Sequence, residues 1–179
     1  MAGSAPEIDL TASARLSARG YRLVQWTGVT PPEHLDDLAV LIGRMSTDAP
    51  TGDLAFEPQR WDAERVRERD AVAVRNGVRA AVTAAQATDG RLVAYTEAST
   101  CVVADGFSSQ GDTLVALAHR GHRLGLWIKL ANLELLLRAH PEVRAIDTFN
   151  ADDNRWMVAI NEQLGFRPLR RQTDWELGL

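Results

Sequence analysis

The sequence predicts an α/β (α+β) domain whose elements follow the order β-α-α-β-β-β-α-β-α-β. Two observations support this prediction. Apolar residues recur at spacings of three and four in the segments interpreted as helices, and shorter runs rich in β-branched and aromatic residues lie between turns with Gly, Pro and Asp. A chain of 179 residues, 45% of them hydrophobic, has enough apolar side chains for the core of one domain, and no internal repeat indicates a second.

The first part of the chain is predicted to be a loose arm at residues 1–18, which are small and polar without a sustained period. A single domain then covers residues 19–179. Prolines and acidic residues suit the first turn of its first helix, where Leu35, Leu38 and Ile42 form an apolar face. The predicted elements are a strand at 20–28, a helix at 31–45, a loop at 46–59 and a highly charged helix at 60–76.

In the second part of the chain, the "ATDG" turn signal predicts a hairpin between two strands. The third helix is expected to end before Pro141 and to have one buried face, marked by Leu126, Leu130, Leu133 and Leu137. The predicted elements are strands at 78–86 and 91–103, a third strand around 113–118 after a polar lead-in, a helix at 126–140, a strand at 143–149, a helix at 152–165 closed by Gly165, and a final strand or strand pair at 166–177.

The composition excludes several classes of function. A net charge of −4 and a pI of about 5.6 argue against general nucleic-acid binding, which normally needs a basic face. The single cysteine, Cys101, gives neither a disulfide framework nor a Cys-rich zinc site, and it suits a reducing cytoplasm. The start of the chain has no secretory signal pattern, and no run of about 18 apolar residues occurs, so we expect neither secretion nor a membrane partner.

A turn with two glycines and four basic side chains joins the third strand to the third helix. It has the sequence "HRGHRLG", residues 119–125. A helix N-terminus exposes unpaired N–H groups and carries partial positive charge, and glycines let a ligand approach the backbone. Arg120 and Arg123 add charge that suits a pyrophosphate. The turn therefore predicts a local polyanion site, and a simple glycine turn among surface charges is the alternative.

The order of elements and two motifs resemble the GNAT superfamily of acyl-CoA-dependent N-acyltransferases. The phosphate loop of that family, Q/R-x-x-G-x-G/A, aligns with residues 120–125, where Arg123 replaces the middle glycine. The second motif of the family runs from an Asn through a Tyr to Gly-Phe, and it aligns with Asn154, Asn161, Gly165 and Phe166. Asn161 thus replaces the tyrosine. The resemblance covers nearly all of the domain and is strongest to actinobacterial-type members, including tandem proteins related to mycothiol synthase.

The resemblance implies the GNAT fold, a mixed and mostly antiparallel twisted sheet flanked by about four helices. It also implies acetyl-CoA as the cofactor without a metal, a small-molecule amine as the acceptor, and it leaves a homodimer open. The strand before the turn should part from the strand at 143–149, so that its backbone can bind pantetheine, and Asn154 should cap its helix or bind pantetheine. The implied cofactor-binding residues are Val115, Ala116, Leu117, Arg120, Gly121, His122, Arg123, Leu124, Gly125 and Asn154.

Two carboxylates are candidates for the base that would remove a proton from the acceptor amine. The position where many members carry a glutamate is Ser109 here, so we consider Glu97 first and Asp112 second. Glu97 lies in mid-strand on the face of Tyr95, and counting along the hairpin places it opposite about Ala116. A solvated strand carboxylate is the alternative interpretation of Glu97.

Other side chains of the turn and the second motif have narrower expected roles. A backbone N–H near Val115 or Ala116 is implied to stabilise the oxyanion. Asn161 can donate a hydrogen bond to the leaving sulfur, but it cannot act as a general acid as a tyrosine can. His119 and His122 lack a third ligand at metal spacing, so we interpret them as phosphate neighbours and not as zinc ligands.

Together these features predict an enzyme that transfers an acetyl group from acetyl-CoA directly to a primary amine. Asp53, Glu57 and Trp61 lie where the family builds its acceptor pocket and would suit a cationic amine, although a solvated loop also explains them. An acetyltransferase of protein amino groups is one rival. The other is a CoA-binding regulatory domain with weak or no catalysis, favoured by Ser109 and Asn161 in place of the usual glutamate and tyrosine.

Overall fold

The computed structural model describes residues 18–48, 59–101, 106–151 and 153–173. The predicted N-terminal arm lies outside the described residues except for Ala18. This residue is only 2% exposed, and its carbonyl accepts a hydrogen bond from the Tyr21 N–H at 3.1 Å. Ala18 therefore belongs to the folded domain and not to a loose arm.

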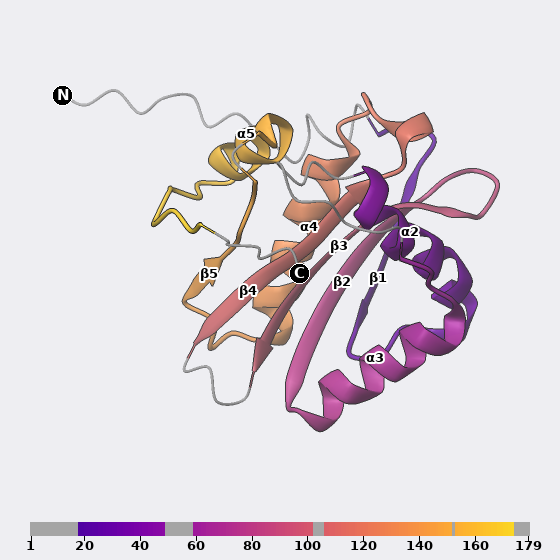
Figure 1. Cartoon of the computed structure of the whole chain (residues 1–179), viewed down its shortest axis with the longest axis horizontal. Helices are drawn as coiled ribbons and strands as arrows, with labels where there is room; N and C mark the ends of the chain where they lie inside the picture. Colours follow the sequence, from indigo (N-terminus) through magenta and orange to yellow (C-terminus); the bar gives the residue numbers. More distant parts are fainter. Residues whose placement is uncertain (1–17, 49–58, 102–105, 152, 174–179) are drawn as a thin grey trace, which may run out of the picture.

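Five strands form one mixed sheet in which the strand order follows the chain, β1-β2-β3-β4-β5 (Figure 1). The first four strands pair in antiparallel fashion, and β4 and β5 pair in parallel. The expectation of a mixed and mostly antiparallel sheet is therefore confirmed. The strands are β1 (Arg22–Thr27), β2 (Val78–Gln86), β3 (Leu92–Cys101), β4 (Phe107–Val115) and β5 (Ala145–Asp147).

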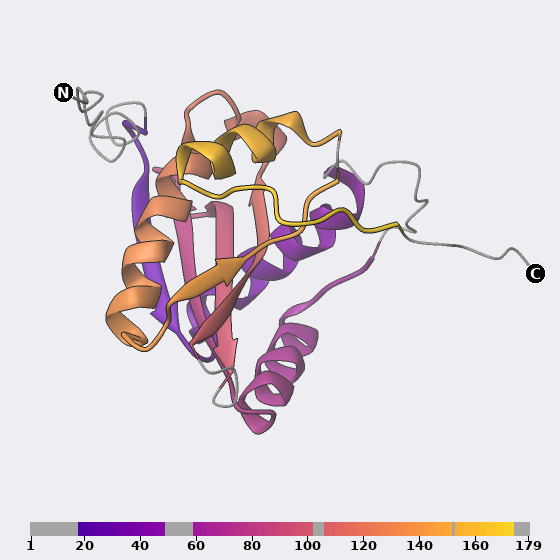
Figure 2. The same cartoon turned by 90° about the vertical axis from the view of Figure 1, so that its left-hand side faces the viewer.

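Helices cover both faces of the sheet (Figure 2). The helices are α2 (Leu35–Asp48), α3 (Ala63–Arg75), α4 (Leu124–Ala139) and α5 (Arg155–Gln163), with short 3-10 turns η1 (Pro32–His34) and η2 (Leu117–His119). On the face covered by α2 and α3, Leu38 packs in one core cluster with Tyr95. On the other face, Ile128 of α4 packs in a second cluster with Ala94, the strand neighbour of Tyr95. None of the helices within the described residues has the length and apolar character needed to cross a membrane.

Local signals begin and end several elements where the sequence predicts. Asp62 Oδ1 accepts a hydrogen bond from the Arg65 N–H at 2.8 Å and so caps the N-terminus of α3. Gly90 in the "ATDG" turn has φ +87°, and Gly165 after α5 has φ +88°, a left-handed conformation that glycine adopts without a Cβ clash. The predicted hairpin between β2 and β3 and the predicted end of α5 are therefore confirmed.

β4 differs from the prediction at both ends. It begins at Phe107, so the polar stretch interpreted as a lead-in is strand, and it ends at Val115, because η2 follows. Few β-branched or aromatic residues mark the polar stretch, and pairing with β3 and β5 on its two sides determines its conformation instead. α2 also extends beyond the prediction, to Asp48 instead of Met45.

The buried face of α4 is rotated from the predicted leucine face. Leu126 is buried as expected, but Leu137 is 43% exposed. A stripe at spacing four is buried instead, formed by Leu124, Ile128, Asn132 and Leu136. A count of apolar residues misses this stripe because Asn132 is polar. Its Oδ1 accepts a hydrogen bond from Thr83 Oγ1 at 3.0 Å, so one of the two polar atoms of this buried side chain has a partner.

The predicted final strand is absent over residues 166–173, the part of it that the structure describes. Pro168 has no N–H to donate to a ladder, and Leu169 is 85% exposed, so this stretch neither pairs nor packs as a strand. Residues 174–177 of the prediction lie outside the described residues.

Candidate cofactor cleft and active site

The basic glycine turn lies between η2 and α4. Gly121 has φ +86°, and Arg123, the N-cap residue of α4, has φ +55°. Left-handed backbone costs roughly 1–2 kcal/mol for a residue with a Cβ, whereas glycine adopts it freely. Arg123 thus combines a backbone conformation suited to the middle glycine of the GNAT loop with a cationic side chain.

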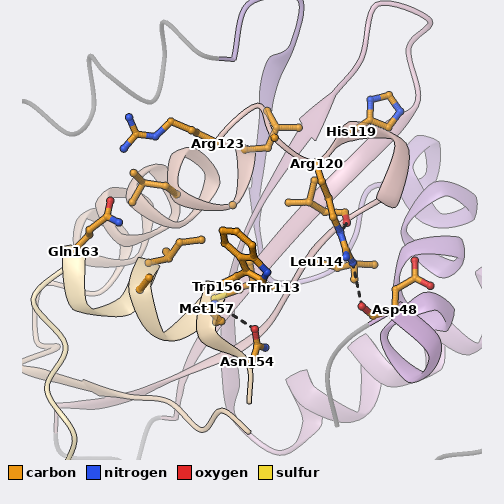
Figure 3. Close-up of a pocket in the computed structure, with 17 residues that line it drawn as sticks. Asp48, Thr113, Leu114, His119, Arg120, Arg123, Asn154, Trp156, Met157 and Gln163 are labelled. Carbon is orange, nitrogen blue, oxygen red and sulfur yellow. Dashed lines mark hydrogen bonds between the residues drawn. The ribbon is translucent and has the colours of Figure 1, made fainter. Parts of the chain in front are cut away.

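A cavity of about 650 Å³ lies beside this turn, between the end of β4, the N-terminus of α4 and one face of α5 (Figure 3). Ala116, Leu117 and His122 do not line it, in contrast to the expectation. Apolar side chains of α5 form the opposite wall. The predicted cofactor-binding residues that line the cavity are Val115, Arg120, Gly121, Arg123, Leu124, Gly125 and Asn154.

The edge of β4 beside the cavity is unpaired over part of its length. The β4–β5 ladder has three residue pairs, and the last joins Ser109 to Asp147, so the two strands part as the resemblance implies. Further along, the Ala116 N–H donates to the Val93 carbonyl at 2.9 Å, on the β3 side. Because N–H groups alternate in direction along a strand, the Val115 N–H points to the β5 side. Ala116 is therefore wrong as an oxyanion donor, and Val115 remains.

Arg120 spans one side of the cavity. Its Nε donates to the Val115 carbonyl at 3.2 Å, and its Nη2 donates to the Asp48 carbonyl at 3.0 Å (Figure 3). Asp48 is the last residue of α2, and a helix C-terminus carries partial negative charge that favours a cation. These two contacts fix a positive charge beside the turn.

The two histidines of the turn contact other protein groups. His119 Nδ1 lies 3.0 Å from the Tyr21 hydroxyl, and His122 Nδ1 lies 3.1 Å from the Arg120 carbonyl. His119 lines the cavity, whereas His122 is exposed outside it. Over the part of the chain that the structure describes, no cluster of three or more His, Cys, Asp or Glu side chains could hold a metal ion.

The two asparagines of the second motif point in different directions. Asn154 lines the cavity, and its Oδ1 accepts a hydrogen bond from the Met157 N–H at 3.2 Å, which caps α5. Asn161 is only 5% exposed and does not line the cavity, because its Oδ1 accepts a hydrogen bond from Lys129 Nζ at 2.8 Å. The structure therefore places Asn161 between α4 and α5, away from the position where a leaving sulfur was expected.

Lys129 is the only lysine of the chain, but no motif or spacing in the sequence assigns it a role. Its side chain is buried, with Nζ 3.9 Å from Met157 Sδ and 5.6 Å from the centre of the Phe166 ring. Burial lowers the pKa of Lys129 from its usual 10.5 to about 8. The lysine links α4 to α5, which forms one wall of the cavity.

The lowered pKa of Lys129 predicts a pH-dependent contribution to stability. Between pH 8 and 10.5 the unfolded chain keeps this proton while the folded chain releases it, so the free energy of unfolding rises with pH across that window. For a shift from 10.5 to about 8 the rise totals on the order of 3 kcal/mol. In denaturant titrations between pH 8 and 10.5, we expect the unfolding free energy of the wild type, relative to that of Lys129→Met, to increase by this amount. A difference between the two proteins that does not change with pH would contradict the lowered pKa of Lys129.

Gly125 lies in the first turn of α4, where α5 packs closely against it. A Cβ at this position would lie 3.2 Å from Ile160 Cδ1 and 3.8 Å from Val115 Cγ2. The residue also lines the cavity. Glycine here therefore permits the contact between α4 and α5, in addition to the expected role of leaving the backbone open to a ligand.

Gly125→Val is expected to destabilise the fold by about 1–3 kcal/mol, because the added branches push against Ile160. Acetyl-CoA affinity should fall as well, since the same branches narrow the cavity. Ile160→Val removes the Cδ1 atom in question, so the double variant should recover at least about 0.5 kcal/mol relative to the sum of the single variants. Thermal unfolding of the four proteins measures this coupling, and strictly additive effects would contradict it.

Glu97 lies on the sheet face that α2 and α3 cover, at an irregularity in the strand pairing. The β3–β4 register shifts between Thr96 and Ala98, which is a β-bulge. A Cβ added at Gly111 would lie 3.2 Å from Glu97 Cγ, so the glutamate packs beside Gly111. The prediction that it lies opposite Ala116 is wrong, because simple hairpin counting includes neither the bulge nor the early start of β4.

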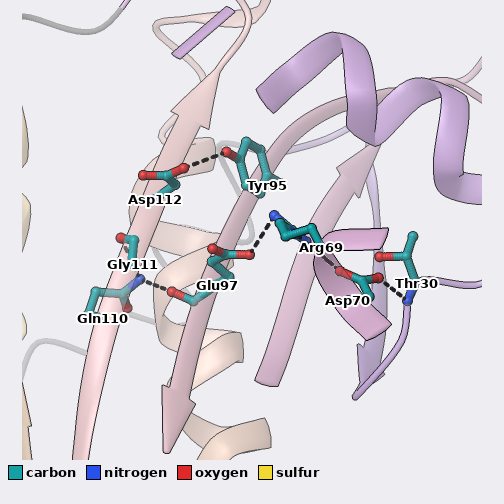
Figure 4. Close-up of polar contacts among 8 residues, drawn as sticks. All are labelled: Thr30, Arg69, Asp70, Tyr95, Glu97, Gln110, Gly111 and Asp112. Atoms are coloured by element: carbon teal, nitrogen blue, oxygen red, sulfur yellow. Dashed lines mark hydrogen bonds and ion pairs between the residues drawn. The ribbon is translucent and has the colours of Figure 1, made fainter. Parts of the chain in front are cut away.

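The two candidate bases lie around Tyr95 (Figure 4). The Tyr95 hydroxyl donates to Asp112 Oδ2 at 3.1 Å, and Arg69 Nη1 lies 3.3 Å from Glu97 Oε2. Burial raises the pKa of Glu97, the charges of Asp112 and Asp70 raise it further, and Arg69 lowers it. The Glu97 side chain is still 28% exposed. A carboxyl group with a raised pKa and partial exposure is suited to accept a proton near neutral pH.

Of the three residues predicted for an acceptor pocket, Trp61 lies within the described part of the chain. Asp53 and Glu57 lie outside the described residues. Trp61 is half-buried, with the Arg65 guanidinium 4.3 Å from its ring centre and its Nε1 donating to Gln59 Oε1 at 3.1 Å. Local packing thus accounts for the position of Trp61.

Known structures are similar to this chain, although no protein-family model and no curated protein matches it. A tandem GNAT protein from the clavulanic acid biosynthesis pathway is 36% identical over 84% of this chain, with a TM-score of 0.69. The chain spans 43% of the length of that protein. An aminoglycoside N-acetyltransferase in complex with CoA is 14% identical, with a TM-score of 0.60 and coverage of 89% and 97% of the two chains. Glucosamine-6-phosphate N-acetyltransferase from Arabidopsis thaliana is 10% identical, with a TM-score of 0.60 and coverage of 88% and 99%.

The sheet, the helices and the order of elements define the GNAT fold. The first of these structures is a GNAT protein by its name, and its 36% identity over 84% of this chain supports the placement of the chain in that superfamily. At 14% and 10% identity, the second and third of these structures show the fold alone.

Proposed function

We propose that the protein is an acetyl-CoA-dependent N-acetyltransferase that acts on a primary amine of a small molecule. The observation that carries this proposal is the cavity of about 650 Å³, which joins the basic turn to the unpaired edge of β4. A helix N-terminus with nearby arginines suits a pyrophosphate, and a strand edge suits a chain of amides. The two acetyltransferases named for amino sugars and aminoglycosides support a small-molecule amine as the acceptor class.

The residues present fit acetyl-CoA, which supplies an activated thioester when bound. Arg120, Arg123 and the N–H groups at the start of α4 would hold the pyrophosphate. The edge of β4 at Val115 would bind the pantetheine amides, next to the apolar side chains of α5. Asn154 already caps α5, so its share in binding is to fix the position of that wall.

Glu97 and the Val115 N–H are the groups that this chain contributes to the acetyl transfer. A simple alkyl ammonium has a pKa near 10, so roughly one molecule in a thousand is neutral at pH 7, and a base is useful. Glu97 accepts that proton directly or through a water, with Asp112 as the second candidate. The Val115 N–H donates to the oxygen on which negative charge develops.

Acetyl-CoA and a panel of primary amines test this function. Thiol release that requires both substrates, together with an acetylated amine detected by mass spectrometry, is the expected result. The same panel includes peptides with free amino groups. Acetylation of these peptides in preference to small amines would support the alternative, an acetyltransferase of protein amino groups. A protein that binds acetyl-CoA by calorimetry but releases no thiol with any amine would instead be a CoA-binding regulatory domain, the candidate favoured by the position of Asn161 in the α4–α5 interface.

We also propose that, within the GNAT superfamily, the chain belongs to the actinobacterial-type members, which include tandem proteins related to mycothiol synthase. The 36% identity to a tandem GNAT protein supports it, since tandem members were the resemblance expected from the motifs. A cytoplasmic location agrees with the single cysteine.

A further inference from the structure

Arg69 of α3 lies between two carboxylates that come from different elements (Figure 4). Its Nη1 lies 3.3 Å from Glu97 Oε2 in β3. Its Nε and Nη2 donate to Asp70 Oδ1 at 3.1 and 3.0 Å. The guanidinium thus uses one side for its helix neighbour and the other for the candidate base, and the planar fork of arginine permits both contacts at once.

Asp70 is itself fixed in place. The residue is 6% exposed, and its Oδ2 accepts a hydrogen bond from the Thr30 N–H at 2.7 Å. A buried carboxylate is stable only when its oxygens are paired, and here both oxygens have a donor. The Arg69 guanidinium is therefore anchored through Asp70 to the segment that follows β1.

The surroundings of Glu97 leave its carboxylate few other positions. Gly111 lies so close that a Cβ there would be 3.4 Å from Glu97 Oε1. The charged and titratable groups that act on Glu97 are Arg69 and Asp70 from α3, Asp112 from β4 and Tyr95 from its own strand. Arg69 is the only cation among them within the described residues.

We propose that Arg69 is a positioning residue for the catalytic base: anchored by Asp70, it holds the Glu97 carboxylate in place against Gly111, between Asp70 and Asp112. This inference rests on the proposed acetyltransferase function, in which Glu97 accepts the proton of the amine. Without the cation, the negative charges of Asp70 and Asp112 act on Glu97 unopposed, so that Glu97 keeps its proton to higher pH.

Arg69→Gln is the decisive variant, because its amide still donates to Asp70 but carries no charge. We expect the pKa of Glu97 to rise by about one unit, measured by NMR on ¹³C-labelled glutamate with the signal assigned by its loss in Glu97→Gln. The acidic limb of the pH profile of kcat/KM should move upward by the same amount, which is about a tenfold loss of kcat/KM below the limb. Arg67, exposed on the same helix, provides the matched control Arg67→Gln, which should change neither quantity.

Arg69→Lys tests the geometry separately from the charge. It should leave the pKa and the acidic limb near those of the wild type while lowering kcat, because an ammonium cannot reach both carboxylates as a fork does. A Glu97 pKa and an acidic limb within roughly 0.3 unit of wild type in Arg69→Gln would overturn the inference. If that variant does not fold, a wild-type kcat in Arg69→Lys would overturn it.

The proposed function and this inference can fail separately. A wild-type protein that transfers acetyl to no amine would overturn the proposed function and, with it, the catalytic part of the inference. The NMR titration of Glu97 needs no turnover, so it would still decide whether Arg69 controls the protonation of that carboxylate.

Discussion

Replacing Glu97 by glutamine should lower kcat/KM by at least about 100-fold at pH 7, within the range of 10²- to 10⁴-fold that general bases commonly contribute. Glutamine keeps the size of the side chain and one hydrogen-bonding oxygen beside Arg69, but it cannot accept the proton. Acetyl-CoA affinity should be nearly unchanged, because Glu97 does not line the cavity at the basic turn. Initial rates over a range of amine concentrations, together with calorimetry, measure both quantities.

The deficit of Glu97→Gln should shrink as pH rises, because solution then supplies more of the neutral amine. Glu64→Gln, an exposed glutamate of α3, is the matched control and should behave as the wild type. Activity of Glu97→Gln within about threefold of wild type at pH 7 would contradict a base role for Glu97 and leave Asp112 as the candidate. Asp112→Asn would then be expected to show the loss.

Arg123→Glu should weaken acetyl-CoA binding by roughly 100-fold or more, since it removes a charge-assisted contact and places a carboxylate at the N-terminus of α4. Arg123→Gly separates the effect of the side-chain charge from the effect of the backbone conformation. Glycine keeps the left-handed conformation at φ +55° without strain, so this variant should bind more weakly than wild type but more tightly than Arg123→Glu.

Calorimetric titration of CoA at low and high salt measures the affinities of the Arg123 variants. The loss should diminish as salt screens the charges. Arg67→Glu makes the same charge change at an exposed residue of α3 that does not line the cavity, and it should leave the affinity as it is. An unchanged affinity in Arg123→Glu would mean that the turn does not bind the phosphates.

Sequence patterns predict an element well where the signal is local. The bounds of β2, Val78–Gln86, agree with the prediction because a glycine precedes them and a turn follows. The polar start of β4 has no such signal, since its strand conformation depends on pairing with β3 and β5. The buried stripe of α4 includes Asn132, whose partner Thr83 is 49 residues away, so a count of leucines selects the wrong face.

The same distinction applies to the site. The basic turn is contiguous in sequence, and most of its predicted residues line the cavity. Glu97 as the base stays a prediction, and its predicted partner is wrong mainly because β4 begins at Phe107, before the predicted start, while the bulge adds a further shift of one residue. The roles of Arg69 and Lys129 follow from tertiary contacts alone, so no sequence pattern predicts them. Along α3, Arg65, Arg67 and Arg69 have the same spacing, and only the fold shows which of them meets Glu97.

The short parallel ladder between β4 and β5 has an energetic consequence for the cavity. β5 has three residues, α5 has nine, and Asn161 is the one buried residue of α5. A segment with so little buried surface opens by local unfolding at a lower free energy than the antiparallel part of the sheet. Since α5 forms one wall of the cavity, a ligand that contacts both walls stabilises the closed segment by mass action. The rate of amide hydrogen exchange in α5 therefore depends on whether the cleft is occupied, even when no group is transferred.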